Sequence, residues 1–236
     1  MHPSTKIESW KDDNIRFIGF MDIMGFKDLV TRKSHEEVKY MLNTLVNLNK
    51  SLESVFGKPD VKTADREKIE SRIRSVTFSD SIMFFSQDDS LEDFLQISYA
   101  LSIFQEASLQ RGAPTKGAIS LGMLTADFKN SVFFGQPLID AYLLQDQLKY
   151  YGIVADNKVE EYIIEKNRKL EPSELRVDRA YVRLKTPFKS GSILHYNIHL
   201  DSVSGEQLEN LYKSVAGEPR KYVDNTIEMF NLMNKK

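Results

Sequence analysis

Two aspartates that interrupt apolar segments are the residues with the clearest chemical potential. Asp22 lies near the end of the apolar run 15–24, and Asp80 lies at a tight turn inside the apolar segment 72–86. A carboxylate is rarely buried without a partner, because taking the charge out of water costs several kcal/mol. Neither segment carries Lys or Arg within two residues of its acid. The two acids therefore predict a bound metal ion.

Two carboxylates that share metal ions suit phosphoryl or nucleotidyl transfer. Two Mg²⁺ ions held in this way can activate an attacking oxygen and neutralise a leaving pyrophosphate. Mg²⁺ uses few protein carboxylates, because substrate phosphate oxygens complete its shell. Gly25 follows the first acid, which suits close approach of backbone to phosphate, and the N–H groups of residues 24–27 could contact a triphosphate. The alternative for each acid is an ordinary turn cap.

The elements that must position these acids follow from the hydrophobic pattern. Strands are predicted at 15–24, 116–124 and 131–134, and a hairpin at 72–86. Helices are predicted at 26–31, at 34–56 with Ser34 as N-cap and Glu37 opposite it, at 90–109 and at 137–150. Strands at 180–184 and 193–200 and helices at 157–169, 207–214 and 219–234 follow. This order predicts an α+β fold in which helices cover an antiparallel sheet.

Length and composition limit the classes of function. The 236 residues predict one domain, with a core at about 15–200 and a C-terminal helical extension at about 205–236. The net charge of −2 gives no electrostatic case for long nucleic acid or an anionic membrane. The chain has no cysteine, which excludes disulfides and thiolate catalysis. Residues 1–13 lack the apolar core of a signal peptide, so a cytoplasmic protein is expected.

Four segments resemble, in order, the signatures of the class III adenylate and guanylate cyclases. FMDIMGF at 20–26 resembles F-x-D-I-x-G-F, and FSDSIM at 78–83 resembles G-D-x-[FY]-M. KGAISLG at 116–122 resembles R-x-G-I-x-x-G, and FGQPLIDA at 134–141 resembles W-G-x-x-V-N-x-A. The resemblance spans residues 15–150. It implies a ferredoxin-like βααββαβ core of the palm type, followed by C-terminal αβ additions.

The resemblance also implies a site and its partners. Asp22 and Asp80 would bind two Mg²⁺ or Mn²⁺ ions, with the carbonyl of Ile23 completing one shell. A nucleoside triphosphate would be the substrate, and a head-to-tail homodimer would form the active sites at its interface. The expected triphosphate contacts are Gly25, Phe26 and Lys189, with Lys185 as the alternative to Lys189.

The chain departs from the family at the positions that read a purine and stabilise the transition state. The base-reading positions carry Val76 and Val132, and the Asn and Arg positions of the later helix carry Ile139 and Leu143. Without polar groups, purine edges cannot be read in the usual way. Replacement base-reading or transition-state groups would come from the region of Val76 or from the cations Arg74, Arg111 and Lys116.

Two further segments resemble the bacterial pyrimidine cyclases of the Pycsar anti-phage system. They are the KGAIS strand and the G-x-P-L-x-x-A-Y-x-L helix, residues 116–120 and 135–144. This resemblance implies conversion of UTP or CTP to a 3′,5′-cyclic monophosphate, a second messenger that activates a separate effector protein. The alternatives are an inactive nucleotide-binding domain, a purine cyclase, a palm-type polymerase or dinucleotide cyclase, and a non-enzymatic interaction domain. The dinucleotide cyclases usually carry a G-G-[DE]-[DE]-F turn, which residues 78–81 lack.

Overall fold

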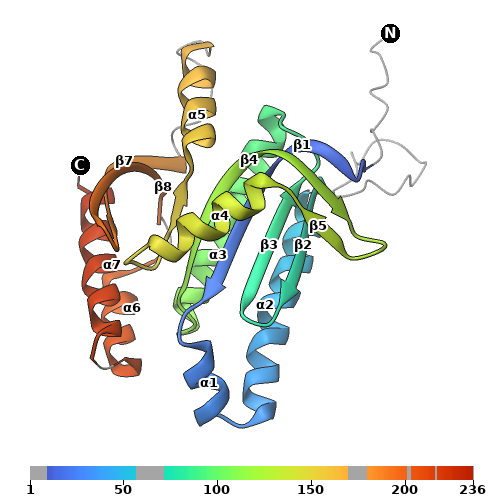
Figure 1. The fold of residues 1–236 in the computed structure, drawn as a ribbon. Coiled ribbons are helices and arrows are strands. Elements are labelled where there is room, and N and C mark those ends of the chain that lie inside the picture. The colour runs from blue at the N-terminus through green and yellow to red at the C-terminus, as the bar shows by residue number, and fades with distance from the viewer. Residues whose placement is uncertain (1–9, 57–71, 170–179, 201–202, 216, 236) are drawn as a thin grey trace.

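The strand that carries Asp22 lies inside an eight-stranded sheet of this computed structural model (Figure 1). The structure describes residues 10–56, 72–169, 180–200, 203–215 and 217–235. The sheet order is β2-β3-β1-β4-β6-β8-β7, and β5 pairs with β4. The strands are β1 (Asp13–Ile23), β2 (Ile73–Phe78), β3 (Ser81–Ser86), β4 (Thr115–Asp127), β5 (Val132–Phe134), β6 (Ile153–Ala155), β7 (Tyr181–Phe188) and β8 (Gly191–Ile198).

The helices cover both faces of this sheet (Figure 1). Residues of α3 and α5 share one apolar cluster with β1 and β3, whereas residues of α4, α6 and α7 share a second cluster with Phe20 and Ala118. The helices are α1 (Phe26–Arg32), α2 (His35–Phe56), α3 (Leu91–Gln110), α4 (Gln136–Gln147), α5 (Asn157–Lys169), α6 (Gly205–Asn210), the 3₁₀ helix η2 (Leu211–Ser214) and α7 (Pro219–Met233).

Local sequence signals account for several of these boundaries. Before α2, the Ser34 N–H donates to Glu37 Oε2 at 2.9 Å and the Glu37 N–H donates to Ser34 Oγ at 3.3 Å, so the predicted reciprocal cap is confirmed. In the strand below α3, Gly19 permits close packing, because a Cβ there would lie 2.6 Å from a methyl carbon of Leu101. The Ser34–Glu37 cap thus accounts for the start of α2, and the absence of a side chain at Gly19 allows the close approach of α3 to β1.

The α+β architecture with a helix-covered sheet is confirmed, and two details of the prediction are wrong. The helix expected at 137–150 ends at Gln147, after which Leu148 bridges to Phe188 and Tyr150 is buried. The short strand β6 was not predicted. It pairs in parallel with β4, so the sheet is not purely antiparallel. Three apolar residues after a helix give too short a pattern to separate a buried strand from the helix end.

Candidate active site

The geometry of two strand ends brings Asp22 and Asp80 together. Asp22 is the last paired residue of β1 opposite β3, where its partner is Ser81, the residue after Asp80. The Ile23 N–H donates to the Asp80 carbonyl at 2.9 Å, which holds the β2–β3 turn against the end of β1. Both aspartates are partly buried. The structure therefore places the two predicted metal ligands beside each other on separate segments.

The electrostatic environment of Asp22 favours a bound cation. Burial, and next the charge of Asp80, raise the pKa of the Asp22 carboxyl to about 6, while Lys116 and a hydrogen bond from Ser81 act in the opposite direction. No ion pair within 4.0 Å joins Asp22 or Asp80 to a basic side chain in the part of the chain that the structure describes. Two partly buried carboxylates without an ion-pair partner among the described residues fit a divalent cation.

These carboxylates supply only part of a metal shell. No group of three or more His, Cys, Asp or Glu side chains with metal-binding geometry occurs among the described residues. Two carboxylates and the Ile23 carbonyl match the requirement of Mg²⁺ for few protein ligands with substrate oxygens completing the shell. The residues therefore fit metal ions that bind together with a phosphorylated substrate, and Ile23 as a ligand stays a prediction.

Lys116 is closer to the acids than the sequence suggested. It is the β4 partner of Asp22, and its side chain is 5% exposed. The adjacent Thr115 is fixed to α3, because Gln105 Nε2 donates to the Thr115 carbonyl at 2.9 Å and the Thr115 hydroxyl donates to Gln105 Oε1 at 2.8 Å. The absence of Lys and Arg within two residues of Asp22 along the chain therefore does not hold for its cross-strand neighbours.

Lys189 lies in the turn between β7 and β8, and its ammonium and that of Lys116 both contact Asp146. Its ammonium forms an ion pair of 2.7 Å with Asp146 near the end of α4. The charge of Asp146 acts on the pKa values of both Asp22 and Lys116. Lys189, as the ion-pair partner of Asp146, therefore lies near the edge of the acid site. Lys185 is exposed on β7. Asp146 had no sequence signal beyond being an acid at the end of an apolar helix.

The segment after Asp22 has fewer backbone N–H groups available for phosphate than the sequence predicted. Gly25 has the positive φ of 73° that glycine tolerates and precedes α1, which begins at Phe26. The Met24 N–H already donates to the Pro114 carbonyl at 2.8 Å, so it is not available for a phosphate. The proposed triphosphate contacts of Gly25 and Phe26 stay predictions.

The other two cations named from the sequence make contacts with groups other than Asp22 and Asp80. The Arg74 guanidinium stacks 4.5 Å from the Trp10 ring centroid and 5.3 Å from that of Phe128. Arg111 is exposed and donates to the Ala107 carbonyl at 2.9 Å, where it caps its own helix. Both side chains have structural contacts that explain their presence.

The position that would read a base is surrounded by apolar side chains. Val76 pairs with Met83, and Met83 pairs with Phe20, which makes a cross-sheet row next to the row that holds Asp22. The ring of Phe20 meets Tyr142 of α4 edge-on at 5.5 Å. This row can contact the flat face of a base and offers no side-chain hydrogen bond to its edge.

The remaining departures from the cyclase pattern lie on the surface. Val132 is 45% exposed, Ile139 is 51% exposed and Leu143 is 54% exposed. Further large exposed apolar side chains occur on the same elements, namely Met123, Phe134 and Tyr142. Exposed apolar side chains thus occur on β4, β5 and α4.

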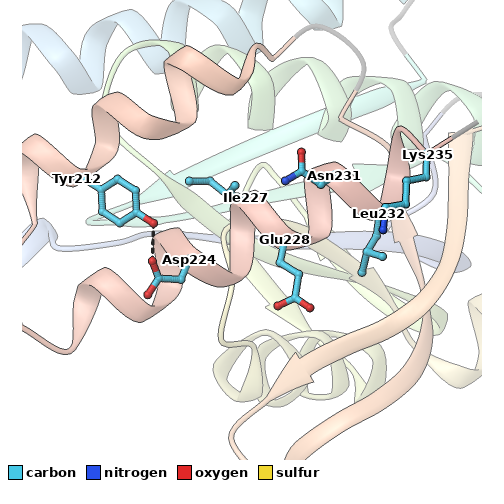
Figure 2. A pocket seen from close by; sticks show the side chains of 7 residues that line it. All are labelled: Tyr212, Asp224, Ile227, Glu228, Asn231, Leu232 and Lys235. Carbon is cyan, nitrogen blue, oxygen red and sulfur yellow. Dashed lines mark hydrogen bonds between the residues drawn. The ribbon is translucent and has the colours of Figure 1, made fainter.

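Two surface hollows lie away from Asp22 and Asp80. One of about 660 Å³ lies between η2 and α7 (Figure 2), and its lining residues are Tyr212, Asp224, Ile227, Glu228, Asn231, Leu232 and Lys235. The other, of about 500 Å³, lies beside α4 and the start of α5. Neither is lined by Asp22, Asp80, Lys116 or Lys189.

Comparison with known proteins identifies the class of fold. A bacterial light-regulated adenylyl cyclase matches with a TM-score of 0.52 at 14% identity, over 86% of this chain and 99% of its own. The catalytic core of a rhodopsin–guanylyl cyclase with converted specificity, in complex with ATPαS, matches with a TM-score of 0.53 at 14% identity, over 81% and 98%. No protein-family model and no curated protein matches the sequence.

The chain therefore has the fold of adenylyl and guanylyl cyclase catalytic domains. Both similar structures are matched over nearly their whole length. No helix in the described ranges is both long and apolar enough to cross a membrane. At this identity the fold is established, and the activity has to be argued from the site.

Proposed function

We propose that this chain is a nucleotide cyclase that converts UTP or CTP to the 3′,5′-cyclic monophosphate and pyrophosphate. The carrying observation is the pair Asp22 and Asp80, which the Ile23–Asp80 hydrogen bond of 2.9 Å holds together. A carboxylate pair without an ion-pair partner in the described residues is costly to fold. Its retention on a cyclase fold supports metal-assisted catalysis.

The reaction forms one phosphorus–oxygen bond and breaks another. The 3′-oxygen loses its proton to solvent and attacks the α-phosphorus, and the α–β bond breaks to release pyrophosphate. Divalent ions held by Asp22 and Asp80 would activate the 3′-hydroxyl and neutralise the leaving group. Lys116 and Lys189 contribute positive charge for the phosphate chain, so the chain's own residues act by positioning and charge neutralisation.

The pyrimidine assignment rests on the base position and on the Pycsar resemblance. Val76, Met83 and Phe20 form an apolar row where purine cyclases carry a polar reader. This row supports a substrate whose base is bound by its face and read by other groups. Arg74, stacked on Trp10, is a poor candidate for that reading.

The test is incubation of the purified chain with ATP, GTP, CTP and UTP in turn, with Mn²⁺, and chromatographic separation of products. A cyclic pyrimidine monophosphate is expected, and Asp22→Ala and Asp80→Ala should each reduce its formation by about 10²-fold or more. Asp28→Ala is the matched control, because Asp28 lies on exposed α1 and pairs only with Arg32 at 3.7 Å among the described residues. Cyclic AMP or cyclic GMP as the product would contradict the pyrimidine assignment.

A second candidate is a nucleotide-binding domain that does not catalyse. Ile139 and Leu143 favour it, because they stand where the similar family carries the Asn and Arg that stabilise the transition state. This protein would bind a nucleoside triphosphate with Mn²⁺ and form no product. Calorimetry on the samples used for the product assay separates the two functions.

We further propose that the active form is a homodimer. The exposed apolar residues of α4 and β5 offer a surface that a second copy would cover, and the family resemblance implies a head-to-tail pair. Leu143→Glu should shift the chain to monomer in sedimentation experiments and abolish cyclase activity together. Glu161→Leu is the control for a surface change, because the Glu161 side chain is exposed on α5. A monomeric wild-type chain with full activity would contradict the dimer.

The anti-phage role extends the same proposal through the Pycsar resemblance alone. The cyclic nucleotide would act on a separate effector protein. In the organism that encodes the chain, Asp80→Ala should raise phage yield, and an unchanged yield would count against the role.

A further inference from the structure

Three elements meet at the edge of the acid site through backbone contacts. The Lys189 N–H donates to the Gln147 carbonyl at 2.8 Å, and the Lys149 N–H donates to the Pro187 carbonyl at 2.9 Å. Leu148 forms a β-bridge with Phe188 between them. These contacts fix the β7–β8 turn to the end of α4. The turn that carries Lys189 therefore cannot move independently of the helix that carries Asp146.

Asp146 contacts two cations with different atoms. Its carboxylate oxygen Oδ2 lies 2.7 Å from Lys189 Nζ, and its backbone carbonyl accepts a hydrogen bond from Lys116 Nζ at 3.3 Å. The Gln147 side chain donates to the same carboxylate oxygen at 3.1 Å. Lys116 is the cross-strand partner of Asp22. Asp146 therefore links the acid site to Lys189 in the β7–β8 turn.

We propose that Asp146 is a positioning residue that holds Lys116 and Lys189 as a two-lysine clamp for the phosphate chain of the substrate, an inference that rests on the proposed function. Lysine carries large rotamer entropy, and an ordered ammonium spends less of its binding energy on immobilisation. An ammonium has three N–H groups, so Lys189 can keep Asp146 and still donate to an anion.

The ion pair between Lys189 and Asp146 adds little to the free energy of unfolding, so stability does not explain why the pair is present. The side chains of Lys189 and Asp146 are 42% and 46% exposed, and exposed pairs contribute about 0–1 kcal/mol. A carboxylate beside a phosphate site also repels the ligand, so it needs a compensating benefit. Ordering of Lys189 supplies that benefit, whereas a purely repulsive acid would weaken binding.

The test is a double-mutant cycle read by calorimetry, with inorganic tripolyphosphate and Mn²⁺ as the probe. The full chain, Asp146→Ala, Lys189→Met and the double variant are compared. Asp146→Ala keeps the carbonyl that Lys116 uses, so its effect passes through Lys189. We expect it to weaken binding about fivefold in the wild-type background and to change binding less than twofold beside Lys189→Met.

Controls exclude a folding defect and a general charge effect. Glu218→Ala removes the partner of Lys149, which lies 3.1 Å away in another exposed pair near this edge, and should leave binding unchanged. Asp146→Glu should restore part of the affinity, and thermal unfolding should be similar for all variants. Tighter binding by Asp146→Ala, or an equal loss in both backgrounds, would overturn the clamp.

The proposed function and the clamp fail separately in this design. A chain that shows the coupling and makes no cyclic nucleotide would retain the clamp and overturn the cyclase. A chain that makes cyclic nucleotide and shows no coupling would retain the cyclase and overturn the clamp. A wild-type chain that binds no tripolyphosphate would also overturn the clamp.

Discussion

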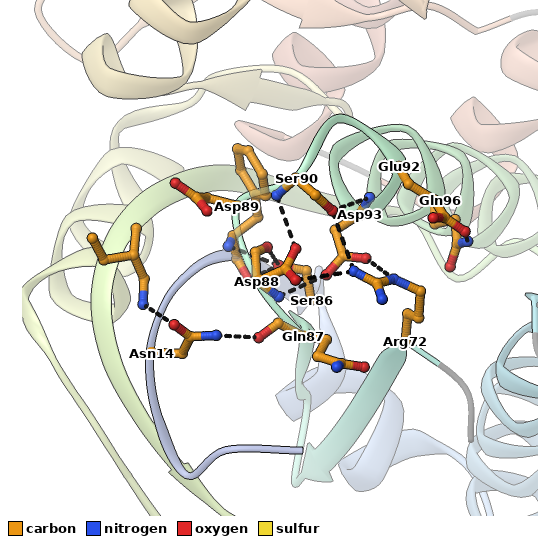
Figure 3. A network of polar contacts seen from close by, with 12 residues as sticks. Asn14, Arg72, Ser86, Gln87, Asp88, Asp89, Ser90, Glu92, Asp93 and Gln96 are labelled. Carbon is orange, nitrogen blue, oxygen red and sulfur yellow. Dashed lines mark hydrogen bonds and ion pairs between the residues drawn. The ribbon is translucent and has the colours of Figure 1, made fainter. Parts of the chain in front are cut away.

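Two pairs of aspartates lie at opposite ends of β3 and differ in their ion-pair partners. Asp88 and Asp93 follow the strand and share Arg72, whose Nη2 lies 3.0 Å from Asp88 Oδ2 and whose Nε contacts Asp93 (Figure 3). The Asp88 N–H donates to Asp93 Oδ2 at 2.6 Å, and Ser90 caps α3 beside them. Among the described residues, Ser81 and the more distant Lys116 offset the charge of Asp22, and neither Asp22 nor Asp80 forms an ion pair within 4.0 Å.

The comparison separates structural acids from acids kept for a ligand. Burial raises the pKa of the Asp93 carboxyl to about 6 as well, but each of its oxygens has a donor and Arg72 pairs with it, so groups within the chain compensate part of the cost. Asp22 is partly buried next to a like charge, which destabilises the ligand-free fold. A bound cation would compensate for such an unfavourable carboxylate pair, and this difference supports the proposal that the chemistry takes place at Asp22 and Asp80.

The largest expected effect comes from breaking the satisfied pair. Arg72→Met leaves Asp93 buried without its cation and should lower the free energy of unfolding by about 3–5 kcal/mol. Urea unfolding at pH 7 measures this change. Arg32→Met, which breaks the exposed pair with Asp28, should cost less than about 1 kcal/mol. Similar losses for both variants would show that the Arg72 cluster is no more important than a surface pair.

A gain in the free energy of unfolding, and not a loss, is expected from a substitution at the other end of β3, where Asp22 and Asp80 lie. In chelator at pH 7, Asp22→Asn should raise the free energy of unfolding by about 1 kcal/mol, because the folded state disfavours the charge and solvent screens part of the effect. A folded pKa of about 6 lies above the usual 3.8. The wild-type chain therefore loses stability as the pH rises from about 4 to about 6, and the advantage of the variant grows over that range.

Added Mn²⁺ should reverse this order. It should raise the unfolding temperature of the wild-type chain and have little effect on Asp22→Asn, because only the wild type keeps both ligands. A variant that is less stable than wild type in chelator would mean that the Asp22 charge is already compensated within the chain.

The sequence predicted the acid pair and not its surroundings. Asp22 and Asp80 stood out because each interrupts an apolar segment, a signal that local reading detects. Lys116 gave no such signal as the partner of Asp22, because the pairing depends on the register between β1 and β4. Asp146 depends on the docking of α4 against the β7–β8 turn, which no local pattern specifies. Local chemistry was predictable, and contacts set by sheet register and helix docking were not.

Most helices and strands were predicted because their hydrophobic pattern is local, and β6 was missed because it has no such pattern. Strong amphipathic patterns gave α2, α3 and α7 to within two residues of the predicted bounds. The short strand β6 is only three residues long and fully buried, so it has no alternation to detect. Its parallel pairing with β4 is a tertiary feature that the sequence pattern does not carry.

The smallest expected effect concerns the backbone of the turn that presents Asp80. Ser79 has a φ of 56°, a conformation that disfavours residues with a Cβ. The cyclase signature resembled by residues 78–83 has glycine at this position. Ser79→Gly removes the conformational penalty and adds backbone entropy to the unfolded chain. We expect a net gain of less than about 1 kcal/mol in urea unfolding.

A second serine provides the matched control for this change. Ser131 has a φ of 57° in the turn between β4 and β5, with no candidate metal ligand beside it. Ser131→Gly should therefore give a similar gain in stability, because the backbone penalty is the same. If Ser79→Gly instead destabilises the chain while Ser131→Gly stabilises it, the Ser79 side chain holds the Asp80 turn in place. The Asp80 turn would then resemble the cluster of Arg72, Asp88 and Asp93, where side-chain contacts fix the backbone. It would resemble less a site whose carboxylates are compensated only by a bound metal.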